Sequence, residues 1–180
     1  MYSQQYLTQL KHLHAAKDRP RGFGGKVKDL GEFHTFMKQW NPKTVLDYGC
    51  GKGTLRPAVL ALAPDLEVAE YDPAMPGKDA DPEPVDVVVC IDVLEHIEPA
   101  CLDDVLTHIQ SLGKGGAFFI VDTVPAQKTL ADGRNAHLIV EDLEWWRDTL
   151  SKYFNILVAQ PIVSEQPERV LVIGVPLAPQ

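Results

Sequence analysis

The sequence predicts one α/β domain: a Rossmann-like, mostly parallel sheet of six or seven strands with an antiparallel C-terminal strand and helices on both faces. Two observations lead to this prediction. A chain of 180 residues suits one hydrophobic core. Short runs rich in Val and Ile alternate with segments of helical periodicity, and that alternation is typical of βαβ units. Strands that are apolar on both faces belong in a sheet that helices cover.

Two helices are expected to open the chain. Apolar residues recur at helical spacing over residues 2–13, and this pattern ends in the stretch 17–25, which is rich in Gly and contains a Pro. A second apolar helical face covers residues 29–40. Asp29 and Glu32 have the spacing of a capping box, so we expect this helix to begin at Asp29.

Strands and helices alternate after that point. We expect a strand at 44–48, a helix capped by Thr54, strands at 67–72 and 86–92, a helix at 99–112, a strand at 116–123, a helix near 140–151, and β-rich runs at 153–160 and 169–177. Pro99 suits a first helical turn, and Gly113 stands where a C-terminal glycine is favoured. We expect the last run to pair antiparallel at a sheet edge.

Composition limits the class of protein. Hydrophobic residues make up 45% and charged residues 23% of the chain, as in ordinary globular proteins. The sequence has neither an apolar run of membrane-spanning length nor the apolar core of a secretory signal, so we expect a cytoplasmic protein without membrane association. The cysteines Cys50, Cys90 and Cys101 lack CxxC spacing, which indicates neither a disulfide framework nor a cysteine-based zinc site.

Charge is distributed unevenly along the chain. The formal net charge is −8, yet residues 1–28 hold six Lys and Arg against one Asp. A basic arm on an acidic body can receive a phosphate or a carboxylate. The alternative is a solvated, lysine-rich helix face.

A glycine-dense turn follows the first predicted strand, with Gly49, Gly51 and Gly53 at every second position after Asp47. Glycine permits backbone angles and a close ligand approach that a side chain would block. The carboxyl end of a parallel strand beside a helix N-terminus is where α/β folds bind nucleotides. Asp72 ends the following strand 19 residues beyond Gly53, where an acid can accept hydrogen bonds from both ribose hydroxyls. Together these features indicate an adenosine-containing ligand.

Two other nucleotide-binding motifs fit these residues less well. A P-loop requires glycine where Leu46 stands, and Ser or Thr where Gly53 stands. The dinucleotide fingerprint requires its third glycine at position 54, which is Thr54. The observed spacing is G-x-G-x-G after an acidic residue.

The stretch LDYGCGKG resembles the first motif of the class I S-adenosylmethionine-dependent methyltransferases, which is an acidic residue followed by G-x-G-x-G. VDVVVCIDVLEHIEP resembles the fourth-strand motif of that family, and LGKGGAFFIVD resembles its fifth strand with the preceding loop. The resemblance covers about residues 27–160. It implies a methyltransferase with S-adenosylmethionine as cofactor and S-adenosylhomocysteine as product.

The resemblance also implies roles for single residues. The three glycines would lie against the methionine part of the cofactor, Asp47 would hold its amino group, and Asp72 would bind the ribose. Asp92 would lie near the methyl-transfer centre, with Glu95 and His96 beside it. The complete expected set of cofactor-binding residues is Asp47, Gly49, Cys50, Gly51, Gly53, Asp72, Asp92 and Val93.

The chain departs from the family between Asp72 and Asp86, where 14 residues replace the usual helix and third strand. A loop must then build the adenine-side wall of the site. Asp79, Ala80 and Asp81 are the nearest candidates for adenine contacts, although acids in a loop are commonly solvated.

Methyl transfer from a sulfonium is an in-line displacement that also removes a proton from a hydroxyl or ammonium acceptor. His137, in the loop after the strand at 116–123, is the candidate base, and Asp92 is the second candidate catalytic residue. Arg134, His96 and Arg21 are candidate substrate contacts. The alternatives are local hydrogen bonding for His137, a structural cap or a contact on the cofactor side for His96, and a surface position for Arg134.

Two further groups have simpler explanations. Asp92, Asp122 and Asn135 offer oxygen ligands, but acids at strand ends are common and we expect no metal. Trp145 and Trp146 either stack a planar substrate or pack in the core, and their helical spacing favours the core.

The acceptor is expected to be a small molecule. The Asn/Asp-Pro-Pro-Tyr motif of amino-group DNA methyltransferases is missing after the fourth strand, and Val89 rather than proline precedes Cys90. We expect residues 1–28 to form a helix and basic loop that serve as a lid, and residues 29–180 to form the methyltransferase domain. The alternatives are methylation of RNA or a modified nucleotide through the basic arm, or a non-catalytic module that binds the cofactor or its product.

Overall fold

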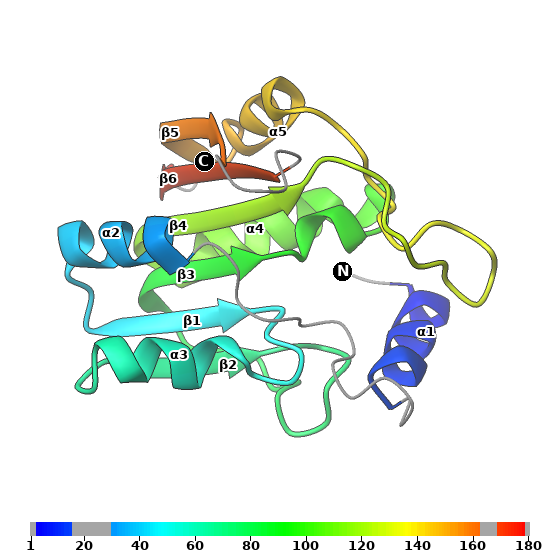
Figure 1. Cartoon of the computed structure of the whole chain (residues 1–180), viewed down its shortest axis with the longest axis horizontal. Coiled ribbons are helices and arrows are strands. Elements are labelled where there is room, and N and C mark those ends of the chain that lie inside the picture. The colour runs from blue at the N-terminus through cyan, green and yellow to red at the C-terminus, as the bar shows by residue number, and fades with distance from the viewer. Residues whose placement is uncertain (1–2, 16–29, 163–168, 179–180) are drawn as a thin grey trace.

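The computed structural model describes residues 3–15, 30–162 and 169–178 (Figure 1). Its elements, in chain order, are α1 (Gln4–Ala15), α2 (Leu30–Trp40), β1 (Thr44–Tyr48), α3 (Leu55–Leu62), β2 (Glu67–Tyr71), β3 (Val85–Ile91), the 3₁₀ turns η1 (Leu94–His96) and η2 (Pro99–Cys101), α4 (Leu102–Leu112), β4 (Gly113–Asp122), α5 (Leu143–Leu150), β5 (Phe154–Pro161) and β6 (Arg169–Pro176). The predicted α/β class is confirmed.

One six-stranded sheet runs through the molecule in the order β2-β1-β3-β4-β6-β5. Strands β1 to β4 pair in parallel, and β6 pairs antiparallel with both β4 and β5. The predicted antiparallel C-terminal strand is therefore confirmed, but its expected edge position is wrong, because β5 forms the edge. Six of the eight β6 residues are buried, as suits a strand with neighbours on both sides.

Helices cover both faces of the sheet (Figure 1). On one face, α4 and α5 pack against the sheet through residues such as Leu106, Ile109 and Trp146. On the other face, α2 and α3 contribute Phe33 and Val59 to a second cluster. Trp146 is fully buried, so its core role is confirmed.

Local details differ from expectation at two helix ends. Thr54 precedes α3 but already has helical backbone angles, φ −78° and ψ −20°, and its side chain makes no cap hydrogen bond. An N-cap side chain reaches the first turn only from an extended backbone, so the predicted cap is wrong. Gly113 caps the C-terminus of α4 as predicted, but its φ of −88° is not left-handed, because it begins β4 directly and pairs with Val85 of β3. Asp29 and its capping box lie outside the described residues.

Helix α1 docks at the carboxyl edge of the sheet. Tyr6 is 1% exposed and packs with Leu130 and Ala136 of the loop after β4. Its hydroxyl donates to the backbone carbonyl of His96 in η1. None of the helices in the described ranges has the length and hydrophobicity needed to cross a bilayer.

Candidate functional site

The glycines in the turn after β1 adopt backbone angles that favour glycine. Gly49 and Gly53 have φ of +77° and +75°, in the left-handed region where side chains are strained. A Cβ at Gly49 would lie 2.5 Å from Val93 Cγ2, and a Cβ at Gly53 would lie 2.1 Å from Glu70 Oε1. The turn is thus enclosed by the segment after β3 on one side and by the end of β2 on the other.

Asp47 lies below this turn, in β1, with 6% of its surface exposed. Burial first, and then the charges of nearby Glu70 and Asp72, raise the pKa of its carboxyl group to about 7 against the opposing charge of Lys78. Asp47 can therefore change its charge near neutral pH.

Asp72 is committed to the backbone of the turn. One carboxylate oxygen accepts from the amide of Gly51 at 2.9 Å and the other from the amide of Ala74 at 2.8 Å. The side chain is buried, with 7% exposure. Through these hydrogen bonds, the Asp72 carboxylate stabilises the packing of the glycine turn against the end of β2.

Glu70 is a candidate site residue that the sequence analysis did not identify. Its carboxylate lies 3.2 Å from Lys78 Nζ, and Lys78 also donates to the carbonyl of Gly51 at 3.4 Å. Glu70 therefore presents its carboxylate beside the glycine turn. An acid near the carboxyl end of β2 was the available signal, but Asp72 offered the same signal two residues later.

Cys50 is buried and protonated, and the three candidate adenine contacts are exposed. Cys50 is buried in the turn, and burial raises its thiol pKa to about 12, so it stays protonated. Asp79, Ala80 and Asp81 are exposed, and Asp79 accepts from the amide of Gly77 at 3.1 Å. The loop geometry agrees with solvated residues there.

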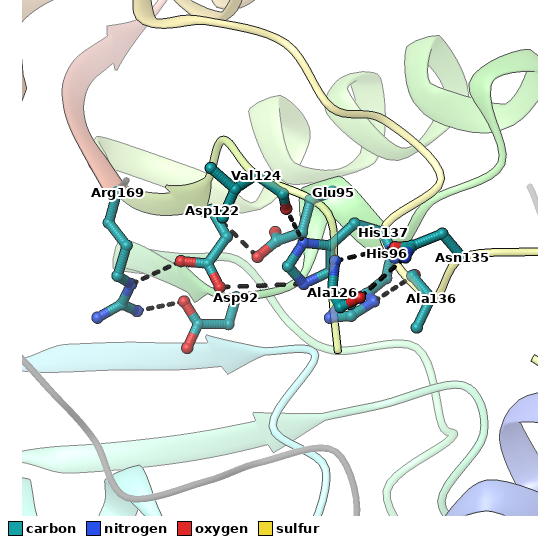
Figure 2. Close-up of polar contacts among 10 residues, drawn as sticks. All are labelled: Asp92, Glu95, His96, Asp122, Val124, Ala126, Asn135, Ala136, His137 and Arg169. Atoms are coloured by element: carbon teal, nitrogen blue, oxygen red, sulfur yellow. Dashed lines mark hydrogen bonds and ion pairs between the residues drawn. The ribbon is translucent and has the colours of Figure 1, made fainter. Parts of the chain in front are cut away.

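A second group of polar residues lies at the ends of β3 and β4, as Figure 2 shows. Asp92 follows β3 with φ +55° and forms an ion pair with Arg169. The same guanidinium contacts Asp122 of β4 at 3.1 Å. Arg169 is 3% exposed and comes from the start of β6, so its place here depends on the antiparallel direction of β6. The sequence analysis did not identify it.

Glu95 is fully buried in η1 next to this ion-pair network. Its Oε1 accepts from the amide of Asp122 at 3.2 Å, and its backbone carbonyl accepts from the amides of Leu138 and Ile139. Burial, together with the charge of Asp92, raises the pKa of the Glu95 carboxyl well above its ordinary value.

Two histidines complete the group. Nδ1 of His137 lies 2.6 Å from the carbonyl of Val124, and its Nε2 lies 3.9 Å from Asp122 Oδ2. Nδ1 of His96 lies 2.7 Å from the carbonyl of Ala136, and burial lowers the pKa of this ring to about 3. The two rings meet edge to face with centroids 4.8 Å apart. The structure thus brings His96 and His137 together with Glu95.

The other predicted substrate contacts lie elsewhere. Arg134 is exposed and pairs with Asp132, with Nε and Nη2 at 2.9 and 2.7 Å from one carboxylate oxygen, which fits the surface alternative. Asn135 accepts from the amides of Ala126 and His137, so its oxygen stabilises the loop. Arg21 lies outside the described residues.

The chain is similar to a known protein family. The profile of a family described as "Methyltransferase domain" matches residues 15–156. Among curated proteins, none matches the sequence closely enough to establish a relative.

Several solved structures share the fold. A 1,6-didemethyltoxoflavin-N1-methyltransferase of Burkholderia thailandensis, with bound 1,6-didemethyltoxoflavin and S-adenosylhomocysteine, has a TM-score of 0.73 and 15% identity over 99% of this chain and 92% of that chain. The N-methyltransferase NodS of Bradyrhizobium japonicum, in complex with S-adenosylhomocysteine, has a TM-score of 0.59 and 16% identity over 95% and 98%. A DhpI–S-adenosylhomocysteine complex has a TM-score of 0.68 and 15% identity over 97% and 98%. At these identities the likeness concerns the fold.

Proposed function

This chain belongs to the methyltransferase-domain family, and we propose that it transfers the methyl group of S-adenosylmethionine to a small-molecule acceptor. The observation that carries the proposal is the glycine turn between Glu70 and Val93. Its positive φ angles favour glycine, and without side chains of their own the half-buried Gly49 and Gly53 let a ligand approach the backbone closely. An adenosyl cofactor on this turn would place its methionine part above Asp47.

Glu70 is our candidate for the acid that binds the ribose. A ribose diol needs a carboxylate with oxygens that accept from two hydroxyls. Both oxygens of Asp72 already accept backbone amides, whereas the Glu70 carboxylate contacts the side chain of Lys78, which can rotate away. We therefore assign Glu70 to the ribose and Asp72 to the support of the turn.

The acceptor would lie near η1. Val93 touches Gly49, so the residues that follow β3 border the cofactor turn. A His137 ring whose Nδ1 donates to Val124 carries its lone pair on Nε2, on the side of Asp122. With this lone pair, His137 can either take a proton from the methyl-acceptor molecule or bind a cation. A small-molecule acceptor is supported by the acidic charge of residues 29–180 and by the ligand named for the Burkholderia protein.

Titration calorimetry with S-adenosylmethionine and S-adenosylhomocysteine tests the proposal. The wild-type chain should bind both, and Glu70→Gln should weaken binding by tenfold or more, because it removes a charged acceptor of two hydrogen bonds. Glu67→Gln, at the opposite, exposed end of the same strand, is the matched control and should bind like wild type.

Asp72→Asn should act on stability first. An amide presents an NH₂ group to one of the two backbone amides that the carboxylate accepts, so the free energy of unfolding should fall by about 1–3 kcal/mol. A folded wild-type chain that binds neither compound would contradict the proposed function. A large affinity loss in folded Asp72→Asn with none in Glu70→Gln would return the ribose role to Asp72.

A further inference from the structure

Three side chains at the carboxyl edge have the composition of a metal site. One potential ligand atom from each of Glu95, His96 and His137 lies within 4.8 Å of the others. Figure 2 shows them side by side, with Glu95 and His96 from η1 and His137 from the loop after β4. Two imidazoles and one carboxylate form a ligand set that recurs in sites for divalent transition metals.

Backbone carbonyls fix both imidazole rings in the tautomer that a metal needs. A carbonyl oxygen only accepts hydrogen bonds, so Nδ1 of His96 donates to Ala136 and Nδ1 of His137 donates to Val124. The lone pair of each neutral ring is then on Nε2. Metal-binding histidines are commonly held in this way, with the other ring nitrogen donating to a carbonyl or a carboxylate.

Glu95 supplies an independent observation. Its side chain is fully buried, yet no donor among the described residues reaches its Oε2, while Oε1 is bonded to the Asp122 amide. A buried carboxylate oxygen without a hydrogen bond is costly, and a bound cation would remove that cost.

The acids around this site carry more negative charge than Arg169 compensates. Carboxylate oxygens of Asp92, Glu95 and Asp122 also lie within 4.8 Å of one another, and Arg169 contacts two of these three groups. When all three acids are ionised, one guanidinium leaves two negative charges uncompensated in this cluster. Glu95 is the fully buried member of the three, and a divalent cation bound to its carboxylate would compensate this excess.

We propose that Glu95, His96 and His137 form a binding site for a divalent transition-metal ion. The two nitrogen ligands favour Co²⁺, Zn²⁺ or Fe²⁺ over Mg²⁺ and Ca²⁺, which prefer oxygen. This assignment replaces the expectation from sequence that the protein holds no metal, and it gives His137 the role of a ligand.

The site also indicates an acceptor class, and this step rests on the proposed function. A cation beside the cofactor turn would bind an acceptor hydroxyl through oxygen and lower its pKa. The hydroxyl proton then leaves to water, the oxygen forms a bond to the methyl carbon, and the carbon–sulfur bond breaks with its electron pair on sulfur. The acceptor is therefore expected to be an alcohol or a phenol.

Cobalt titration of the untagged, full-length chain after chelator treatment tests the site. Wild type should bind one equivalent of Co²⁺ with visible ligand-field bands, and a large excess of Mg²⁺ should not abolish them. Glu95→Gln and His137→Gln should each weaken Co²⁺ binding by about 100-fold or more, since even the loss of a supporting partner costs 10–100-fold. His108→Gln is the matched control, because His108 lies on α4 and contacts Tyr48 instead.

The two proposals can fail separately. Circular dichroism melting shows whether each variant folds, and His137→Gln, nearer the surface than Glu95, serves if Glu95→Gln does not. Wild type without Co²⁺ binding, or folded variants that bind like wild type, would overturn the metal site. Co²⁺ binding without S-adenosylhomocysteine binding would leave the metal site intact and contradict the methyltransferase proposal.

Discussion

At the scale of single residues, the raised pKa of Asp47 predicts how cofactor binding depends on pH. The folded-state pKa of Asp47 is about 7, against 3.8 for an ordinary aspartate. If its carboxylate holds the cofactor amino group, only the ionised form binds well. Cofactor affinity should then rise with pH by up to about tenfold per unit below pH 7 and level off above it. Calorimetry from pH 5.5 to 8.5 measures this profile, and Asp47→Asn should bind more weakly at every pH with a flatter profile.

The same residue makes an opposite prediction for stability. An acid whose pKa is raised by folding keeps its proton in the folded state while the unfolded state loses it. As the pH rises from about 4 to 7, ionisation of Asp47 in the unfolded state lowers the free energy of unfolding. The total decrease is on the order of 4 kcal/mol for a shift of this size. Asp47→Asn removes this cost, so without cofactor its melting temperature relative to wild type should be higher at pH 8 than at pH 4.5. A difference that does not change with pH would contradict the buried, protonated Asp47.

The candidate site could be predicted from sequence only in part, and Glu70 shows why. The glycines and Asp47 carry a local signal, since strand, acid and turn are contiguous. Glu70 lies one residue before the end of β2 and Asp72 lies one residue after it, so their spacing from the turn differs by two residues. The acid that accepts hydrogen bonds from the amides of Gly51 and Ala74 is less available to a ligand. Tertiary structure, and not the local sequence, determines that this acid is Asp72.

At the scale of secondary-structure elements, the order of the last two strands had a signal in the sequence. In β6 nearly every residue is apolar, as expected for an internal strand, whereas β5 includes the polar residues Asn155 and Gln160, both of which are exposed. The absence of a helix between β2 and β3 was predictable too, because 14 residues leave no room for it. The place of Arg169 was not, since it depends on β6 running back to the carboxyl edge.

Helix α1 provides the prediction at this scale. Its main anchor is Tyr6, which is buried against the loop after β4 and donates a hydrogen bond to the His96 carbonyl. Two exposed hydrogen bonds add to it, from the Ser3 amide to Glu98 and from the Gln9 side chain to Asp132. Removal of a buried aromatic side chain costs about 3–5 kcal/mol, so Tyr6→Ala should detach α1. Trypsin cleavage at Lys11 should then accelerate by about 100-fold, while the melting temperature of the rest of the domain changes little.

A control variant separates the anchor from the surface contacts. Gln9→Ala removes one exposed hydrogen bond and should change the cleavage rate by only a few-fold. If α1 is part of a lid, Tyr6→Ala should also reduce methyl transfer more than S-adenosylhomocysteine affinity. Unchanged proteolysis in Tyr6→Ala would show that other contacts hold the helix.

At the scale of the whole molecule, the charge distribution predicts weak or no binding of RNA. Residues 1–28 carry six basic side chains, and the net charge of the chain is −8. Even if all six contacted phosphates, log K for single-stranded RNA would fall with log salt concentration with a slope of about −4. The acidic remainder repels the strand, so fluorescence anisotropy with a 20-nucleotide RNA should show no binding at 150 mM salt and at most weak binding at 20 mM.

Charge reversal of Arg19 and Arg21 tests the source of any residual binding. If the basic arm attracts RNA, Arg19→Glu with Arg21→Glu should abolish the binding at low salt and leave S-adenosylhomocysteine affinity nearly unchanged. Submicromolar RNA binding at 150 mM salt, lost in this variant, would instead support a nucleic-acid acceptor, because specific complexes keep their affinity at physiological salt. If wild type binds no RNA at either salt concentration, the acceptor search should begin with alcohols and phenols, screened with and without added Co²⁺.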